Sequence, residues 1–156
     1  MFCVKILLVY CEVFMKVVCQ VCDFELFSPI VREPVTTLGL YDDARFRGRS
    51  ILLLNKHFEN IEELPTIVSN AFMEDIKLYV KVLKNVVNVD RVNVSILGNS
   101  VPHIHAHLIP RYPEVEEFPG KSPWNDLRVL EPLNPKDKNC LINNIKTERE
   151  KFFITK

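Results

Sequence analysis

Three of the four histidines in the chain, His103, His105 and His107, lie within five residues. In an extended strand alternate side chains share a face, so the three imidazole rings would line one side at steps of roughly 7 Å. The intervening residues, which would face a core, are Ile104, Ala106 and Leu108. One histidine in such a strand is usually structural, whereas three in phase indicate chemistry on the exposed face. A metal site, general acid–base catalysis and nucleophilic catalysis by an imidazole all remain open from this pattern.

The five cysteines are odd in number and irregularly spaced, which argues against a disulfide framework and against secretion. Cys19 and Cys22 form a C-x-x-C pair, which in a reducing compartment is typical of metal binding or redox chemistry. Redox chemistry is less favoured, because the context is not the strand–helix start of a thioredoxin. With His57 and His103 the pair has the composition of a closed Cys2His2 zinc site, and free thiols beside an ordinary helix start are the alternative.

Hydrophobic periodicity and chain breakers predict the elements that must position these residues. The polar run DDARFRGR separates two short apolar segments, as in a β-hairpin or in two strands with a functional loop. Residues 110–135 hold six prolines and predict an ordered loop. The expected strands and helices together predict an α+β fold. They are strands at 38–41, 50–54, 91–97 and 101–109, with a turn at 98–100, and helices at 65–87 and 136–153.

Length and charge restrict the classes of protein that this chain can belong to. Its 156 residues suit one domain, and the 20 acidic and 20 basic residues cancel, so no overall field attracts nucleic acid or an anionic membrane. The apolar runs within 1–18 are too short for a signal sequence or a membrane span, and Met15 is an alternative first residue. We therefore expect a cytoplasmic protein with an N-terminal extension at 1–18, the main part of the domain at 19–135, and a C-terminal helix at 136–156 that belongs to it.

One stretch of the sequence matches a known signature. The run LGNSVPHIHAHLIPRY resembles the His-φ-His-φ-His-φ-φ motif (φ is apolar) of the histidine triad, or HIT, superfamily. The resemblance extends upstream through GRSILLLNKHFENIEEL, which is similar to the strand and helix start of bacterial-type HIT hydrolases, and it includes the C-x-x-C and Trp124. It covers about residues 19–124 and implies a HIT-like antiparallel sheet, or half-barrel, with one long helix and a C-terminal helix.

The resemblance implies a catalytic role for the middle histidine. His105 would attack the α-phosphorus of a nucleoside phosphate, since a neutral imidazole is nucleophilic near pH 7 and its adduct divides one hard displacement into two easier ones. We expect the Nδ1–H of His105 to donate to a backbone carbonyl near His103. His107 would bond a non-bridging phosphate oxygen, and Ser100 and Asn99 would bind the same phosphate or assist the leaving oxygen, unless they serve only the turn.

The resemblance also implies where the substrate would lie. Asp42 or Asp43 would bind the ribose hydroxyls, although both suit an ordinary turn. Phosphate contacts are expected from Arg49, where many relatives have a histidine, from Arg111, and from Asn93, which is otherwise a strand-surface residue. Trp124 would stack on a base or pack against a second subunit.

The expected partners and cofactors follow from the same family. Several zinc-containing HIT proteins use the set that Cys19, Cys22, His57 and His103 would form, so a structural zinc is expected and no organic cofactor; a catalytic metal on the triad is the alternative. The leading function is hydrolysis of a dinucleoside polyphosphate, nucleoside phosphoramidate or similar adenylate by a homodimer. A nucleotidyl transferase or phosphorylase, or a nucleotide- or zinc-binding protein without turnover, is the alternative.

Overall fold

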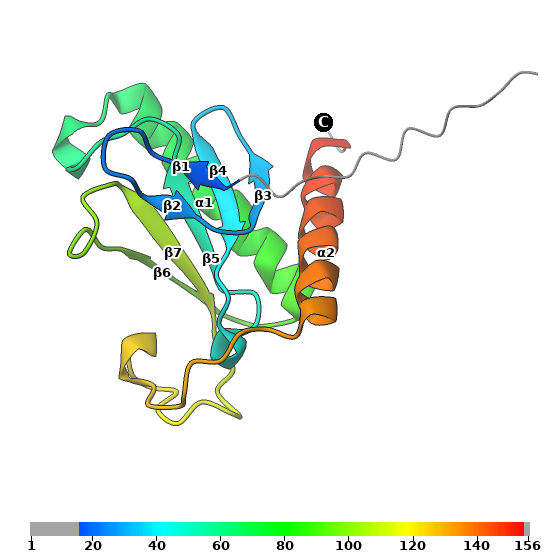
Figure 1. Ribbon diagram of the computed structural model, residues 1–156. Helices are drawn as coiled ribbons and strands as arrows, with labels where there is room; N and C mark the ends of the chain where they lie inside the picture. Colours follow the sequence, from blue (N-terminus) through cyan, green and yellow to red (C-terminus); the bar gives the residue numbers. More distant parts are fainter. Residues whose placement is uncertain (1–15, 155–156) are drawn as a thin grey trace, which may run out of the picture.

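The computed structural model describes residues 16–154, so most of the expected N-terminal extension, with the alternative start Met15, lies outside the described residues. Within these residues two α-helices, seven strands and three short 3-10 helices form the fold (Figure 1). The helices are α1 (Thr66–Val87) and α2 (Pro135–Ile154). The strands are β1 (Val17–Val18), β2 (Glu25–Leu26), β3 (Pro29–Arg32), β4 (Thr36–Leu40), β5 (Ser50–Leu54), β6 (Val92–Ile96) and β7 (His105–Pro110). Within residues 16–154, none of the helices has the length and apolarity that a membrane crossing needs.

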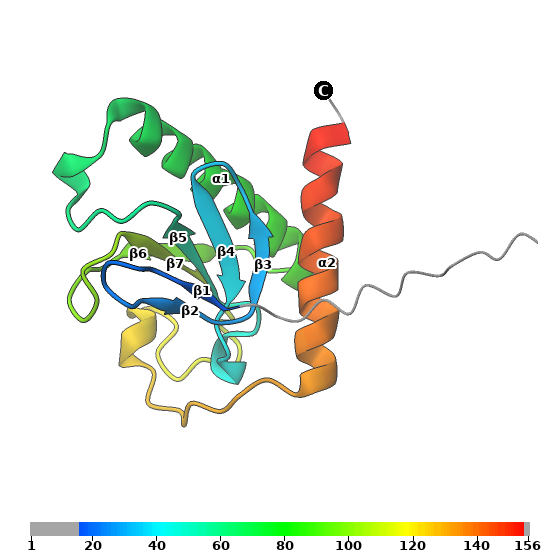
Figure 2. The same cartoon turned by 45° about the horizontal axis from the view of Figure 1, so that its top comes forward.

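The centre of the molecule is an antiparallel five-stranded sheet in the order β3-β4-β5-β7-β6. Figures 1 and 2 show α1 crossing behind the sheet and α2 standing beside its β3 edge. The predicted α+β class is therefore confirmed. Residues 38–41 and 50–54 are the two arms of a hairpin, because Leu40 pairs with Ser50 across the loop.

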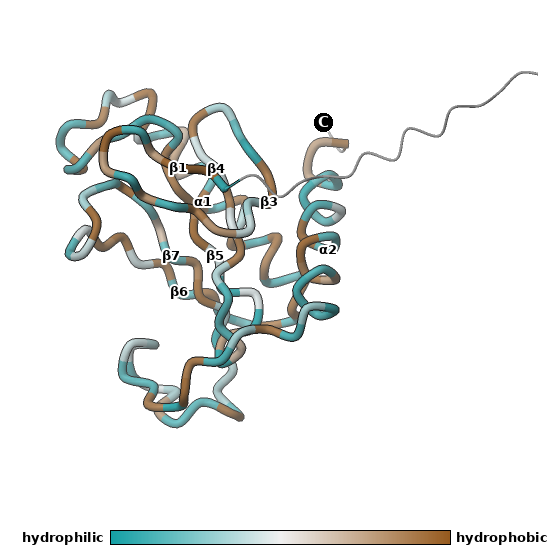
Figure 3. Tube along the Cα trace, viewed as in Figure 1, coloured by the Kyte–Doolittle hydropathy of each residue, from teal (hydrophilic) through white to brown (hydrophobic). Residues whose placement is uncertain are grey.

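The main core lies between the sheet and the two helices. Leu52, Ala106 and Leu108 are fully buried on this face and pack with the apolar stripe of α1. Figure 3 shows the hydrophobic colour along β5, at the middle of the sheet. The carboxylate of Glu33, just after β3, accepts hydrogen bonds from Tyr79 of α1 at 2.6 Å and from Arg149 of α2 at 2.8–2.9 Å. This buried network fixes α2 to the rest of the domain.

The long helix was predicted from its periodicity, and its bounds agree to one residue. Pro65 precedes α1 as its N-cap and has no N–H to lose, so the helix begins cleanly at Thr66. Asn88 ends it with a left-handed backbone, φ 53°, which asparagine tolerates better than most residues. The apolar face that this helix buries includes Phe72, Ile76, Tyr79, Val82, Leu83 and Val87.

A small hairpin of β1 and β2 covers the opposite face of the sheet, and the sequence pattern did not predict it. Leu26 of β2 packs on Ile51 and Leu53, the β5 residues that point away from α1. Gly39 makes this approach possible, because a Cβ there would lie 2.7 Å from Leu26 Cδ1 and 2.9 Å from the Phe27 carbonyl oxygen. The hairpin therefore forms one wall over the central strands.

The last predicted strand starts later than expected, which changes the position of the first triad histidine. Strand β7 begins at His105, so His103 and Ile104 precede the ladder and residues 101–109 are not one strand. Pro102 has no N–H, the His103 N–H donates to the Val101 carbonyl at 2.9 Å, and the Ile104 N–H donates to Phe58. His103 therefore lies outside the strand that carries His105 and His107. The apolar residues between them are buried as predicted.

Candidate active site and metal centre

The geometry of His105 leaves one of its ring nitrogens free to react. Its Nδ1 lies 2.7 Å from the His103 carbonyl oxygen, which can only accept, so Nδ1 carries the proton. The expected contact with a carbonyl near His103 is present. Nε2 has no hydrogen bond within the described chain, and it is not among the fully buried unpartnered atoms, so it reaches the surface of a cavity that His105 lines. A neutral imidazole held in this way presents a lone pair.

His107 is the next residue on the same face of β7, with its ring centroid 4.9 Å from that of His105 and the planes at 72°. Burial, together with the charges of His105 and Arg49, lowers the pKa of His107 to about 4. His107 is therefore neutral near pH 7. Its Nδ1 is buried and has no hydrogen-bond partner among the described residues, whereas its other nitrogen is the one that can meet a ligand.

The two histidines open into a cavity of about 1320 Å³. This exceeds the roughly 300–1,000 Å³ of a typical small-molecule pocket. It lies on the sheet face opposite α1, between the β1–β2 hairpin, the loop after β6 and the N-terminal part of α2. Seven of the residues predicted for chemistry or substrate contact line it: Asp42, Arg49, Asn99, Ser100, His105, His107 and Trp124.

Asp43 does not reach this cavity and is not placed to bind a ribose. Its carboxylate is completely buried; one oxygen accepts from Arg45 Nε at 2.9 Å and the other from Arg49 Nη1 at 2.8 Å. Burial alone would raise the pKa of Asp43, but the two arginines outweigh it and lower that pKa. Asp42 does line the cavity, where it accepts from the Leu133 N–H and from Lys138 Nζ at 2.7 and 2.9 Å.

Arg111 and Asn93 also lie away from the cavity. The Arg111 guanidinium pairs with the buried carboxylate of Glu116, and its Nη1 donates to Asn93 Oδ1 at 3.0 Å. Nη2 donates to the Pro119 carbonyl at 3.1 Å. These bonds fold the start of the proline-rich segment back onto β7. The phosphate contacts expected for Arg111 and Asn93 are therefore not what their geometry provides.

The sequence pattern did not point to several residues that line the cavity. His107 pairs with Ser95 on β6 and with Ile51 on β5, and both partners line the cavity. The Phe24 ring packs at an angle on His105, with ring centroids 5.2 Å apart. Lys138 of α2 also lines the cavity. Strand alternation puts Ser95 on one face with Asn93, but only the pairing register places it opposite His107.

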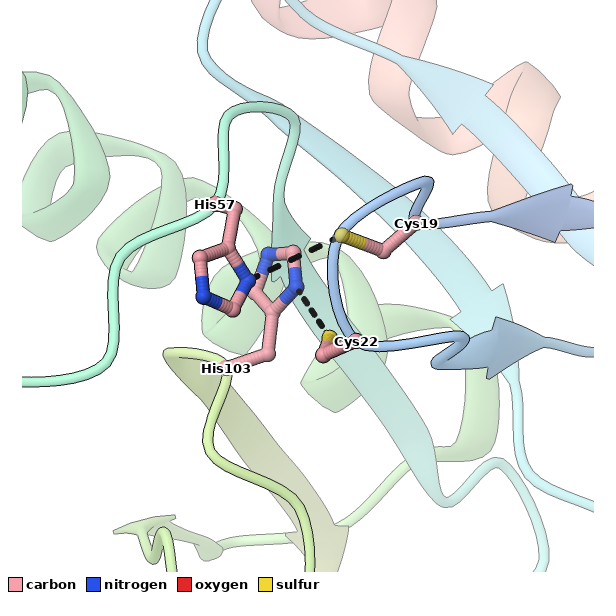
Figure 4. Close-up of side chains that lie close together, drawn as sticks. All are labelled: Cys19, Cys22, His57 and His103. Carbon is pink, nitrogen blue, oxygen red and sulfur yellow. Dashed lines mark hydrogen bonds between the residues drawn. The ribbon is translucent and has the colours of Figure 1, made fainter.

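A separate cluster lies at the other end of the triad. Cys19 and Cys22 are in the β1–β2 loop, His57 follows β5 and His103 precedes β7, and Figure 4 shows the four side chains converging. Their four candidate ligand atoms all lie within 4.8 Å of one another. Cys19 Sγ is 3.7 Å from His57 Nδ1, and Cys22 Sγ is 3.5 Å from His103 Nδ1. In a tetrahedral zinc site with bonds of about 2.0–2.3 Å, neighbouring ligand atoms stand roughly 3.5 Å apart, so the donor set fits zinc.

The surroundings of this cluster also suit a metal. His103 Nε2 lies 2.9 Å from the Leu54 carbonyl oxygen, and His57 Nε2 lies 3.4 Å from a Glu59 carboxylate oxygen. Each acceptor favours a proton on Nε2, which leaves Nδ1 as the ligand. Burial raises the pKa of both thiols, but at Cys19 hydrogen bonds from the Val21 and Cys22 backbone outweigh it and lower the pKa. The cluster thus offers two sulfur atoms and two imidazole nitrogens as ligands.

A family model described as HIT domain matches residues 30–114, which is more than half of the chain. The chain belongs to the HIT domain family. An uncharacterised HIT-like protein of Methanocaldococcus jannaschii is 30% identical over 103 residues, which cover 63% of this chain and 80% of that protein. The membership agrees with the motif around His105, which lies inside the matched range.

Solved structures of HIT proteins share the fold. A histidine triad protein from Sinorhizobium meliloti superposes with a TM-score of 0.70 at 21% identity, covering 77% of this chain and 87% of that one. A zinc-bound histidine triad family protein from Mycobacterium smegmatis has a TM-score of 0.60 at 13% identity, with 82% and 87% covered. A diadenosine triphosphate hydrolase from Plasmodium falciparum, in complex with cyclomarin A, has a TM-score of 0.55 at 18% identity, with 84% of each chain covered.

Proposed function

We propose that this HIT protein hydrolyses a dinucleoside polyphosphate or a related adenylate at the α-phosphorus, with His105 as the nucleophile. The observation that carries the proposal is the 2.7 Å contact between His105 Nδ1 and the His103 carbonyl oxygen, because it leaves the Nε2 lone pair facing the cavity. The family supports the same chemistry, since one of its structural neighbours is named a diadenosine triphosphate hydrolase.

The reaction divides into two displacements. In the first, His105 Nε2 forms a bond to the α-phosphorus while the bond from phosphorus to the bridging oxygen breaks. The departing phosphate chain leaves as an anion and needs no proton, and the His103 carbonyl stabilises the positive charge that the ring gains. In the second, water attacks the phosphorus, the N–P bond breaks, the nucleotide leaves, and the water proton passes to solvent.

The lining of the cavity supplies candidate contacts for both ends of such a substrate. His107 Nε2, the Ser100 hydroxyl and the Asn99 amide are the proposed contacts for phosphate oxygens, since all three residues line the same cavity as His105. Asp42 is the acid at the rim that can accept from ribose hydroxyls, in preference to the buried Asp43. Trp124, 46% exposed, offers a face for stacking a base. The cavity volume of about 1320 Å³ leaves room for more than one nucleotide unit.

We further propose that zinc occupies the Cys19, Cys22, His57 and His103 cluster in a structural role. A metal there would hold His103 through Nδ1, and His103 supplies the carbonyl that orients the nucleophile. No step of the reaction needs the metal itself. Zinc would attach the β1–β2 loop to the strands that carry the triad.

A homodimer is proposed through the edge strand β6 and the exposed face of α1. Two exposed apolar side chains, Val94 on β6 and Met73 on α1, are 42% and 51% accessible. β6 is an edge of the sheet, so its free backbone groups suit pairing with a second copy. Light scattering should give twice the 18.2 kDa chain mass, and Val94→Lys should return the monomer.

The test is hydrolysis of diadenosine tetraphosphate and of adenosine 5′-phosphoramidate by the full-length protein. His105→Ala and His105→Gly should each lose about 10³-fold or more in kcat while nucleotide binding by calorimetry persists. A nucleotidyl adduct of the native protein, trapped in acid-free conditions, should map to His105 by mass spectrometry. Unchanged activity in His105→Ala would overturn the mechanism.

The same assay separates the neighbouring activities. Inorganic phosphate added to the reaction should not divert the transferred nucleotide from water to ADP. Formation of ADP would indicate a phosphorylase that shares the first displacement. Binding of nucleotide with no turnover and no adduct would instead indicate a non-catalytic nucleotide-binding protein.

A further inference from the structure

Among the described residues, two buried side-chain nitrogen atoms have no hydrogen-bond partner: Arg49 Nε and His107 Nδ1. Buried polar atoms are almost always bonded, so a pair of exceptions at one site needs an explanation. The two atoms have complementary chemistry. Arg49 Nε can only donate, whereas His107 Nδ1 can either accept or donate. Neither atom is accessible to a ligand in the cavity, so a substrate does not satisfy them directly.

The strand register places the two side chains as neighbours. Ile51 pairs with His107, and Arg49 precedes Ile51 by two residues, which puts its side chain on the same face as a diagonal neighbour of His107. The Tyr41 N–H donates to the Arg49 carbonyl at 2.8 Å and extends the β4–β5 ladder to this residue. Trp124 lies over both, with its ring 5.6 Å from Arg49 Cζ and 5.4 Å from the His107 centroid.

The orientation of the Arg49 guanidinium is fixed on three sides. Its Nη1 donates to the buried Asp43 at 2.8 Å, Tyr41 lies beneath it with the ring centroid 4.1 Å from Cζ, and Trp124 closes the outer side. The Asp43 carboxylate is itself held by Arg45. Because the guanidinium cannot turn, the direction of its Nε–H is set by the fold. The positive charge also helps to keep His107 neutral, in agreement with its low pKa.

We propose that Arg49 is a positioning residue that sets the tautomer of His107. The fixed positive charge of Arg49 beside this ring disfavours a proton on Nδ1, which is buried and has no acceptor among the described residues, so Nδ1 keeps its lone pair and the His107 proton resides on Nε2. His107 then offers an N–H to the α-phosphate oxygens, beside the lone pair that His105 offers to phosphorus. In the opposite tautomer a lone pair would face the phosphate and repel it.

The catalytic consequence rests on the proposed function, but the tautomer can be measured without any substrate. In two-bond ¹H–¹⁵N spectra of the full-length protein at pH 7, with His107 assigned from the His107→Gln variant, we expect the neutral Nε2–H form. Arg49→Met keeps the length of the side chain and removes the charge, so it should give a mixture of tautomers. Arg49→Lys retains a donor-only cation and should restore most of the Nε2–H form. Lys138→Met removes another cation of the cavity and should leave the tautomer unchanged.

Two results would overturn the inference: a native His107 protonated on Nδ1, or a spectrum of Arg49→Met with the native tautomer. If Arg49→Met does not fold, the native spectrum and Arg49→Lys still decide between the two forms. In the hydrolysis assay Arg49→Met should lower kcat about tenfold with a smaller change in KM. If His105→Ala proves active the proposed function fails, while the tautomer result stands on its own spectra.

Discussion

His103 and His107 stand on either side of His105, and the protein holds them by different chemistry. His103 belongs to a cluster of soft metal ligands contributed by three separate segments. His107 lies beside a buried ion-pair network in which Asp43 is shared by Arg45 and Arg49. At the first end a metal can fix the ring directly. At the second end the ring nitrogen has no bonded partner, and its environment acts through charge and burial.

In the proposed function the two histidines have different tasks. His103 contributes its backbone carbonyl, so its ring is free to serve as a ligand. His107 contributes its ring, so its ring must stay neutral and correctly protonated without a metal. Changes at the two ends should therefore produce different signatures, in stability at the first end and in protonation at the second.

The largest effect is expected from removing the metal. The protein purified from cells should contain about one equivalent of zinc, and chelation should lower Tm by about 10 °C, which corresponds to roughly 3–5 kcal/mol for a domain of this size. Cys22→Ser should show the low Tm with or without added zinc. Cys140→Ser, which removes an exposed thiol outside the cluster, should behave as the native protein. A Tm that does not change on chelation would mean that no bound metal stabilises this cluster.

Asp43→Ala should cost about 3–5 kcal/mol of unfolding free energy, because it leaves two arginines near the core without their shared carboxylate. Urea unfolding gives the value. Asp42→Ala is the matched control in the same loop; its side chain is 37% exposed, so it should cost about 1 kcal/mol. Equal losses of unfolding free energy in the two variants would show that the buried ion pairs of Asp43 contribute no more to stability than the exposed contacts of Asp42.

The candidate metal cluster around His103 could be predicted from the sequence far better than the surroundings of His107 and Arg49. Cys19, Cys22, His57 and His103 have side chains whose chemistry is specific enough to identify a site before their positions are known. The HIT motif likewise pointed to His105 and to a carbonyl near His103. The fold class and α1 followed from composition and periodicity, because a 22-residue helix leaves a long apolar pattern.

The arrangement around Arg49 and His107 depends on strand register and burial, which cannot be derived from a single sequence. Asp42 and Asp43 are adjacent and chemically identical, yet only the fold decides which one is buried with arginines. Arg111 is of a residue type that often binds phosphate, but here it forms an ion pair with Glu116, five positions later. The β1–β2 hairpin has strands of two residues each, too short for any periodicity.

The pH dependence of stability should separate the two ends further. An unfolded His107 takes up a proton near pH 6.5, but in the folded protein its pKa is about 4. The unfolded state therefore binds more protons between these values, and the free energy of unfolding should fall as pH drops from 6.5 to 4, by about 2–3 kcal/mol from this residue. Above pH 6.5 the contribution is flat.

His107→Gln isolates this contribution in chemical denaturation at several pH values. The other histidines are common to both proteins, so the difference between native and variant free energies reports on residue 107. That difference should decrease steadily as the pH is lowered through the window. A difference that stays constant would mean that His107 titrates normally, and the contrast between the two ends would lose its electrostatic basis.

The smallest effect is expected for Trp124→Ala. The indole is 46% exposed, so the unfolding free energy should change by less than about 1 kcal/mol, and KM for diadenosine tetraphosphate should rise about tenfold, at the low end of the 1–3 kcal/mol of base–aromatic stacking. Leu127→Ala, an exposed residue three positions later that does not line the cavity, is the control. A fall in kcat with KM unchanged would instead mean that Trp124 acts by covering Arg49 and His107, and would assign it to the ion-pair end of the site.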